Sequence, residues 1–357
     1  MKTSLRLLAL AAACAAALAA APATANTLRT VEVAKGLDNP WALAFLPDGR
    51  MLVTEKPGRL RVIGPDGRPG APITGLPPIA AGGQCGLLDV VPDPQFAQNQ
   101  LLYWTFAEPG AGGNSTAVAR GKLVGNALTE VRTLFSQQPK VDSQHHCGSR
   151  IVFRRDGTLL VGLGDRFSRK DDAQNPANHL GKVVAFDRDG GKAAVWSLGH
   201  RNIQGAALHP ETGALWAIEH GPQGGDEVNV VAQGRNYGWP LLTYGRNYGL
   251  GTRIGEEGPK PGFEQPLHVW VPSIAPSGMA FLTSDRYPGW QGQLFVGALR
   301  GRTLVRLQLE GTKVVTEERL LLNLAERIRD VRQGPDGWLY LVTDGSNARV
   351  LRVETTR

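Results

Sequence analysis

Cysteine is scarce in this chain, with only 3 in 357 residues, which excludes a small scaffold held together by many disulfides. Charged residues make up 20% and hydrophobic residues 42%, a composition that excludes a disordered chain and a coiled coil. Glycine and proline are abundant by contrast, with 45 and 24 residues scattered along the sequence. Such frequent interruption favours many short strands joined by turns, and therefore a mostly-β globular protein.

Long hydrophobic runs are also absent, except at the N-terminus. There, two basic residues precede LLALAAACAAALAAA, and a small-residue cleavage site ends at Ala25. These features predict a secretory signal peptide over residues 1–25, removed to leave a single domain over residues 26–357. A membrane anchor is the disfavoured alternative, because the run is short, rich in alanine and followed by Pro22. We therefore expect a soluble protein without a membrane span, exported to the periplasm or secreted.

Runs of like charge are missing as well. The formal net charge is +7, and it falls by two once the predicted signal peptide is removed. This modest and dispersed excess argues against nucleic acid as a partner. It remains compatible with a local basic pocket for an anionic small molecule.

One hairpin pattern recurs six times along the chain. Each copy has a short apolar strand, a turn built on Pro, Asp or Gly, and a second strand with alternating large apolar residues. The copies occupy residues 41–63, 86–106, 149–166, 204–222, 277–299 and 329–345. Their spacing suits a four-stranded propeller blade plus a variable loop, whereas a β-sandwich would not explain six returns of one hairpin. The sequence therefore predicts an all-β, six-bladed β-propeller of four-stranded antiparallel blades, with long loops at 166–195 and 241–270 on the functional face.

Polar residues stand at the strand ends of these copies, where side chains project into a central channel. His146 enters the third copy and Asp165 closes its hairpin, so the carboxylate is expected to return to the imidazole. A histidine oriented in this way is a candidate general base, and surface histidines with a turn aspartate are the alternative. Other polar residues in equivalent places are Gln84, Arg201, Asn202 and Gln204.

Arginines also recur at these strand ends. Arg327 and Arg329 share one face of an extended segment, and together with Arg201 and Arg300 they are suited to a ligand with several carboxylates. Exposed arginines paired with neighbouring acidic residues are the alternative. The Gly221–Pro222 turn offers free carbonyl oxygens near acidic residues, as calcium requires, although no D-x-D-x-D-G loop is present.

The segments LGHRNIQG, EHGPQGGDEVN with NYGWP, and RIRDVRQGPDG resemble the soluble quinoprotein glucose dehydrogenase and aldose sugar dehydrogenase family. The resemblance extends over nearly the whole chain from about residue 30 to residue 353. Members of this family use pyrroloquinoline quinone (PQQ) and calcium on a six-bladed propeller. The resemblance implies oxidation of the anomeric carbon of aldoses such as glucose to the lactone, with electrons passing to an external acceptor such as a quinone, cytochrome or dye.

The resemblance also implies a role for each site residue. His146 matches the base that takes the proton of the anomeric hydroxyl while hydride passes to the quinone, and Asp165 matches the acid that orients it. The positions that hold or face the cofactor and substrate are Gln84, Arg201, Asn202, Gln204, Arg300, Arg327 and Arg329. The carbonyl groups of Gly221 and Pro222 match ligands of the catalytic calcium, and Glu227 with Tyr237 match a second, structural calcium site.

Two positions depart from the family pattern. Arg300 stands where members commonly have lysine, which keeps the charge but changes the donor geometry. His145 stands where related enzymes carry Asp or Asn, so contacts to the ring hydroxyls, and even which of the two histidines is the base, stay open.

Two cysteines, Cys85 and Cys147, remain after removal of the signal peptide. An oxidising compartment allows this pair to form one disulfide, and two buried free thiols are the alternative. Because the cysteines lie directly beside Gln84 and His146, we expect a disulfide near the floor of the active site.

Two other functions stay open at this point. A calcium-dependent propeller lactonase or hydrolase would also use a channel metal and a histidine, but it would not need four arginines around one face. A non-catalytic sugar-binding propeller would not need a base oriented by a carboxylate. The preferred sugar, the electron acceptor and the choice between monomer and homodimer are not fixed by the sequence.

Overall fold

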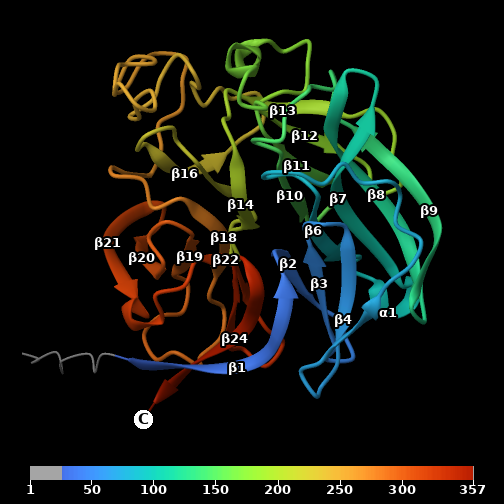
Figure 1. Ribbon diagram of the computed structural model, residues 1–357. Helices are drawn as coiled ribbons and strands as arrows, with labels where there is room; N and C mark the ends of the chain where they lie inside the picture. The colour runs from blue at the N-terminus through green and yellow to red at the C-terminus, as the bar shows by residue number, and fades with distance from the viewer. Residues whose placement is uncertain (1–25, 357) are drawn as a thin grey trace, which may run out of the picture.

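The computed structural model describes residues 26–356 and contains six four-stranded antiparallel sheets arranged as blades around a central axis (Figure 1). One strand of each blade lies innermost, and each inner strand packs against its neighbours around the ring. The inner strands are β2 (Pro40–Phe45), β6 (Leu87–Pro92), β10 (Gly148–Phe153), β14 (Ile203–Leu208), β18 (Pro276–Phe281) and β22 (Ile328–Gln333). The predicted all-β, six-bladed propeller is confirmed, and each predicted hairpin forms the inner pair of one blade.

Three further strands complete each blade, in chain order except in the last blade, which contains β1. They are β3 (Met51–Glu55), β4 (Arg59–Ile63), β5 (Pro69–Pro72), β7 (Leu101–Gly110), β8 (Gly113–Val124), β9 (Ala127–Ser136), β11 (Leu159–Leu163), β12 (Lys182–Phe186), β13 (Ala194–Leu198), β15 (Leu215–Glu219), β16 (Asp226–Val231), β17 (His268–Trp270), β19 (Leu294–Ala298), β20 (Leu304–Glu310), β21 (Lys313–Leu320), β23 (Leu339–Thr343), β24 (Ser346–Thr356) and β1 (Thr27–Asp38). The helices are one turn or so long: α1 (Phe96–Asn99), η1 (Lys170–Gln174) and η2 (Leu322–Leu324).

The turns of the hairpins are stabilised by residues within the turns themselves. Gly49 and Gly337 adopt φ values of 86° and 84° in their turns, a conformation that costs glycine little. Asp48 and Asp336 accept backbone N–H bonds within the same turns, at 3.1 and 3.2 Å. The second strands β3, β11, β15 and β23 are almost entirely buried because each blade packs against two neighbours.

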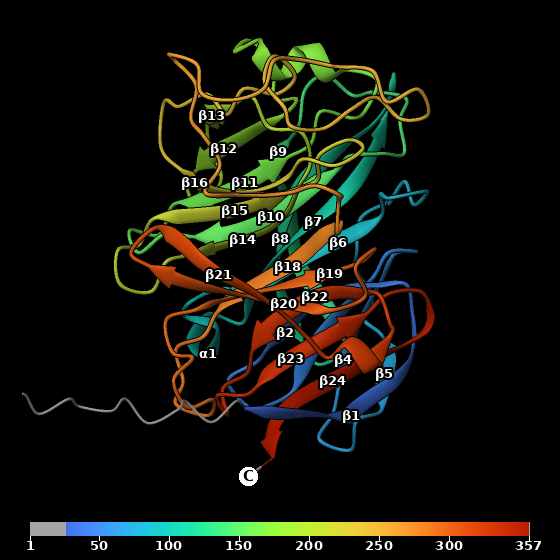
Figure 2. The same cartoon turned by 90° about the vertical axis from the view of Figure 1, so that its left-hand side faces the viewer.

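The ring is closed by the first strand of the chain. β1 pairs with β24, so the last blade has the order β1-β24-β23-β22 (Figures 1 and 2). The repeat analysis did not predict this closure, because β1 has no hairpin of its own. The predicted signal peptide at 1–25 lies outside the described residues, and no helix within 26–356 is long and apolar enough to cross a membrane.

The predicted long loops have different limits in the structure. The predicted loop at 166–195 is wrong in extent, because strand β12 already begins at Lys182. The buried ammonium of Lys182 donates to the carbonyl groups of Asp172 and Ala173 at 2.9 and 3.0 Å. The second loop is longer than predicted and covers residues 232–267. Gln174 joins the two loops through Trp239 O at 2.7 Å, and both figures show them at the same edge of the molecule.

A buried charge network fills the middle of the channel. Arg150 binds Asp89 at 3.2 Å and Asp330 at 2.9 Å, and Arg332 binds the same two carboxylates at 3.0 Å each. The charges of the two arginines thereby balance those of the two aspartates, and these four residues come from three blades. The Arg150 guanidinium also lies 4.1 Å from the ring centre of Trp41, which belongs to a fourth blade. The network joins blades far apart in sequence beneath the polar strand ends.

Candidate active site

The predicted site residues gather at one end of the channel. Because paired strands run antiparallel, the start of each inner strand and the end of the following strand lie at the same end. Residues before or at the start of inner strands are Gln84, His146, Arg201, Asn202, Gln204, Arg327 and Arg329. Residues after second strands are Asp165, Gly221, Pro222 and Arg300.

His146 and Asp165 form the predicted pair. The Nδ1 atom of His146 lies 2.7 Å from Asp165 Oδ1, and both side chains are buried. Asp165 Oδ2 accepts a 2.7 Å bond from the indole of Trp239, which the long 232–267 loop supplies. Since an ionised carboxylate only accepts hydrogen bonds, Nδ1 carries the hydrogen and Nε2 is left as the acceptor. His145 is exposed and is not the histidine that Asp165 holds.

The surroundings keep His146 neutral. Burial lowers the pKa of His146, the charge of Arg201 lowers it further, and the bond to Asp165 acts in the opposite direction. Burial alone would raise the pKa of Asp165, but the bond to His146 and the charge of Arg201 lower it overall. A neutral imidazole beside an ionised carboxylate is the arrangement of a general base.

Gln84 holds the backbone of the candidate base. Its side-chain carbonyl accepts the His146 N–H at 2.8 Å, and His146 adopts a positive φ of 49°. The predicted disulfide between Cys85 and Cys147 is present, with 5.8 Å between the Cα atoms. The two segments that carry Gln84 and His146 are thus joined covalently and by a hydrogen bond.

Three arginines converge on the same end of the channel. Arg201 is 4% exposed, donates to His220 O at 2.9 Å and lies over Trp239, while its Nε has no partner among residues 26–356. Arg327 and Arg329 both bind Asp344, at 2.8 and 3.1 Å. The single Asp344 carboxylate therefore forms ion pairs with two guanidinium groups.

Burial and this positive charge both lower the pKa values of neighbouring groups. Burial lowers the pKa of His220 to about 3, to which the charges of Arg201 and Arg329 contribute. Burial also lowers the pKa of Lys56, as do the charges of Arg329 and Arg327. Lys56 follows β3, at the strand end equivalent to Asp165, and this shared position is the signal that the sequence analysis missed.

The backbone of Arg300 lies at this end of the channel, where its N–H donates to Ile274 O at 3.0 Å. Its side chain is exposed and makes no hydrogen bond or ion pair with the part of the chain that is described. Its convergence with the other arginines therefore stays a prediction.

Asn202 and Gln204 form part of the wall below these cations. Asn202 Oδ1 accepts from Gly148 N at 3.2 Å and from Gln204 Nε2 at 3.1 Å. Gln204 Oε1 in turn accepts from Arg329 at 3.3 Å, and its backbone carbonyl accepts from Arg150 at 2.6 Å. These bonds connect the candidate site to the charge network in the channel.

The Gly221–Pro222 turn is shaped by Asp226, whose role the sequence analysis missed. Asp226 Oδ1 accepts from Gly221 N at 3.0 Å, and Oδ2 accepts from Ser273 Oγ at 2.6 Å and two backbone N–H groups. A Cβ at Gly221 would lie 2.3 Å from two carbonyl oxygens, so only glycine fits. Within residues 26–356, the carbonyl oxygens of Gly221 and Pro222 accept no hydrogen bond.

Glu227 lies opposite Glu219 in the pairing of β16 with β15. Burial and the charge of Glu219 raise the pKa of Glu227 to about 8. The Tyr237 hydroxyl donates to Val230 O at 2.6 Å, so only its backbone carbonyl is available to a cation. In the described chain, no three His, Cys, Asp or Glu side chains come together as metal ligands, so both predicted calcium sites depend on backbone carbonyls.

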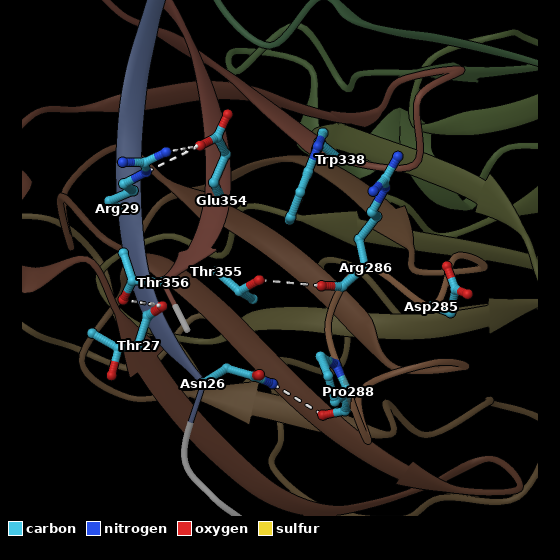
Figure 3. A pocket seen from close by; sticks show the side chains of 10 residues that line it. All are labelled: Asn26, Thr27, Arg29, Asp285, Arg286, Pro288, Trp338, Glu354, Thr355 and Thr356. Atoms are coloured by element: carbon cyan, nitrogen blue, oxygen red, sulfur yellow. Dashed lines mark hydrogen bonds and ion pairs between the residues drawn. The ribbon is translucent and has the colours of Figure 1, made fainter.

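The strand ends opposite the candidate site border a large open groove of about 890 Å³. Figure 3 shows the side chains that line it. The groove is lined by the ends of β1 and β24 and by the turns near Arg286 and Trp338. Three of its charged residues are already engaged, with Arg29 paired to Glu354 at 2.7 Å and Arg286 stacked on Trp338. The chemistry of the strand ends, rather than groove size, therefore locates the candidate active site.

The fold and the site define a six-bladed propeller with a buried histidine–carboxylate pair at one end of its channel. The sequence model of the family described as Glucose / Sorbosone dehydrogenase matches residues 37–352, and the chain belongs to this family. The resemblance stated from the sequence is thereby confirmed.

Several relatives are similar over almost the whole chain. The aldose sugar dehydrogenase YliI of Escherichia coli is 43% identical over 352 residues, which cover 93% of each protein. A crystal structure of a glucose dehydrogenase has a TM-score of 0.88 and 45% identity, covering 92% of this chain and 100% of that one. The PQQ-bound aldose sugar dehydrogenase of Streptomyces coelicolor has a TM-score of 0.78 and 29% identity, covering 94% of this chain and 100% of that one.

Proposed function

We propose that this chain is a periplasmic aldose sugar dehydrogenase that uses PQQ and calcium. It oxidises the anomeric carbon of aldoses such as glucose to the lactone and passes the electrons to an external acceptor. The observation that carries the proposal is the buried His146–Asp165 pair beside a cluster of cations. The PQQ-bound relative from Streptomyces coelicolor supports the choice of cofactor.

The cation cluster fits a ligand with several carboxylates. Arg201 Nε is buried and lacks a partner among the described residues, and an unsatisfied buried donor costs free energy unless an acceptor reaches it. Asp344 alone cannot balance Arg327, Arg329 and the nearby Lys56. PQQ has three carboxylates, so we assign its binding to Arg201, Arg327, Arg329, Arg300 and Lys56, with Gln84, Asn202 and Gln204 around it.

The Gly221–Pro222 turn fits calcium. Hard cations prefer oxygen ligands, and these two carbonyl oxygens have no donor among residues 26–356. We place the catalytic calcium there and a structural calcium beside Glu227 and the Tyr237 carbonyl. When bound, PQQ supplies a quinone that accepts hydride, and calcium polarises it.

His146 is the base in this proposal. Its Nδ1 hydrogen is held by Asp165, which leaves Nε2 to take the proton of the anomeric hydroxyl. The lowered pKa keeps the imidazole unprotonated at neutral pH, so the base is ready before the sugar arrives.

A calcium-dependent propeller hydrolase is the alternative function. It also fits a histidine and a channel metal, but it gives no role to the arginines around one face. The experiment is reconstitution of the purified protein, depleted of ligands, with glucose and other aldoses. Dye reduction is expected only when both PQQ and calcium are added. Turnover without the quinone, with lactone hydrolysis, would favour the hydrolase instead.

A further inference from the structure

Phe167, which follows the Asp165 carboxylate by two residues, is held in an unfavourable conformation. Arg166 and Phe167 have φ values of 61° and 65°, in the left-handed region that bulky residues avoid. Glycine would adopt this conformation without strain, yet the chain places a phenylalanine there and leaves it 50% exposed. Strain of this kind persists only where the surrounding structure enforces it.

The neighbours of Phe167 enforce it. Asp165 Oδ1, the oxygen that binds His146, also accepts the Phe167 N–H at 2.7 Å. The Arg166 side chain turns the other way and is fully buried, where it donates to Asn114 Oδ1 at 2.7 Å and to His145 O at 3.2 Å. With Arg166 directed inward, Phe167 is directed outward beside the candidate base.

The Phe167 ring lies against both histidines. Its centre is 5.1 Å from that of His146, at 83°, and 5.5 Å from that of His145, at 41°. His145 is exposed like Phe167, whereas His146 is buried. The exposed Phe167 ring therefore offers an apolar surface directly beside the buried candidate base.

We propose that Phe167, flanked by His145, is the platform on which the apolar C–H face of a pyranose ring packs while the anomeric hydroxyl reaches His146. This assignment rests on the proposed function and makes Phe167 a specificity-determining residue for that site. Aromatic rings provide a large, rigid apolar face, and an exposed one beside a base suits a ligand that is apolar on one face and polar at its edge.

The test measures binding of 1,5-anhydroglucitol, a pyranose that lacks the anomeric hydroxyl and is not oxidised at C1. Calorimetry on the protein loaded with PQQ and calcium is expected to show binding weakened about 2- to 10-fold by Phe167→Ala and retained by Phe167→Tyr. The control is Val124→Ala, which removes an equally exposed side chain at the other end of the propeller. Steady-state kinetics with aldoses should place the loss in KM rather than in kcat.

The Phe167→Gly variant tests whether a loss of sugar binding arises from a folding defect. Because glycine relieves the strain, this variant is expected to keep or raise the thermal midpoint while it loses sugar affinity. Unchanged anhydroglucitol binding in Phe167→Ala and Phe167→Gly would overturn the platform. A protein that binds no PQQ and oxidises no aldose would instead overturn the proposed function, so the two failures are distinct.

Discussion

Asp165 accepts hydrogen bonds from His146, from the Phe167 backbone and from Trp239. Three donors keep the carboxylate ionised and fixed, and the fixed carboxylate determines which imidazole nitrogen carries hydrogen. The proposed role of His146 as a base therefore depends on groups from two loops as well as on the segment that precedes β10.

Replacement of the candidate base tests this at the residue scale. His146→Ala is expected to lower kcat by about 10²- to 10⁴-fold while PQQ binding persists, because the imidazole acts on the substrate proton. His209→Ala, at the opposite end of the propeller, is the control and should have little effect. A larger loss in His145→Ala than in His146→Ala would show that the base is at position 145.

The pH profile tests the role of Asp165. The acid limb of kcat/KM should lie below the ordinary histidine pKa of about 6.5, since burial and Arg201 lower the pKa of His146. Asp165 raises that pKa, so Asp165→Asn should move the acid limb to still lower pH. Turnover should also fall, on the order of 10²–10⁴-fold, because the imidazole hydrogen is no longer held. An acid limb that moves to higher pH would contradict this account.

The sequence predicted the His146–Asp165 pair because the two residues open and close one hairpin. It could not predict Trp239 as a partner, because the indole comes from a loop 74 residues away. Lys56 was missed although it occupies an equivalent strand end, because a single lysine beside a turn has the appearance of a solvated residue.

At the scale of elements, the disulfide joins the entry to β6 with the entry to β10. Cys85 and Cys147 were predicted to pair because each lies beside a site residue, and the structure places those residues, Gln84 and His146, in contact. The extent of the 164–181 loop was not predicted, because the burial of Lys182 among carbonyl groups leaves no pattern in the sequence.

Removal of the disulfide has a defined expectation. Cys85→Ser combined with Cys147→Ser should lower the free energy of unfolding by about 2–4 kcal/mol, because the cross-link closes a segment of 62 residues. The measurement is urea unfolding of the variant and the parent protein. Alkylation of the denatured, unreduced mature protein should detect no free thiol, and two free thiols would contradict the pairing.

At the scale of the whole molecule, six local hairpins become one ring through contacts that are distant in sequence. The hairpins could be predicted because turn chemistry and strand alternation are local. The β1–β24 pairing and the bond from Arg332 to Asp89, 243 residues away, could not, because nothing local in either segment identifies its partner.

The charge network in the channel is expected to be a main determinant of stability. Asp330→Asn leaves Arg150 and Arg332 with too little negative charge and should cost about 3–5 kcal/mol in the free energy of unfolding. Asp285→Asn, on an exposed turn, should change it by less than about 0.5 kcal/mol. Chemical denaturation measures both, and equal effects would show that the network contributes little.

The central claim is that cations from separate blades bind one tricarboxylate, and titration of the calcium-loaded protein with PQQ tests it most directly. One PQQ should bind per chain, and Arg201→Gln and Arg329→Gln should each weaken binding by roughly 10-fold or more, because each removes a charged hydrogen-bond donor. Arg132→Gln, on the outer strand β9, should bind PQQ like the parent protein. Undiminished PQQ binding in both site variants would contradict the account.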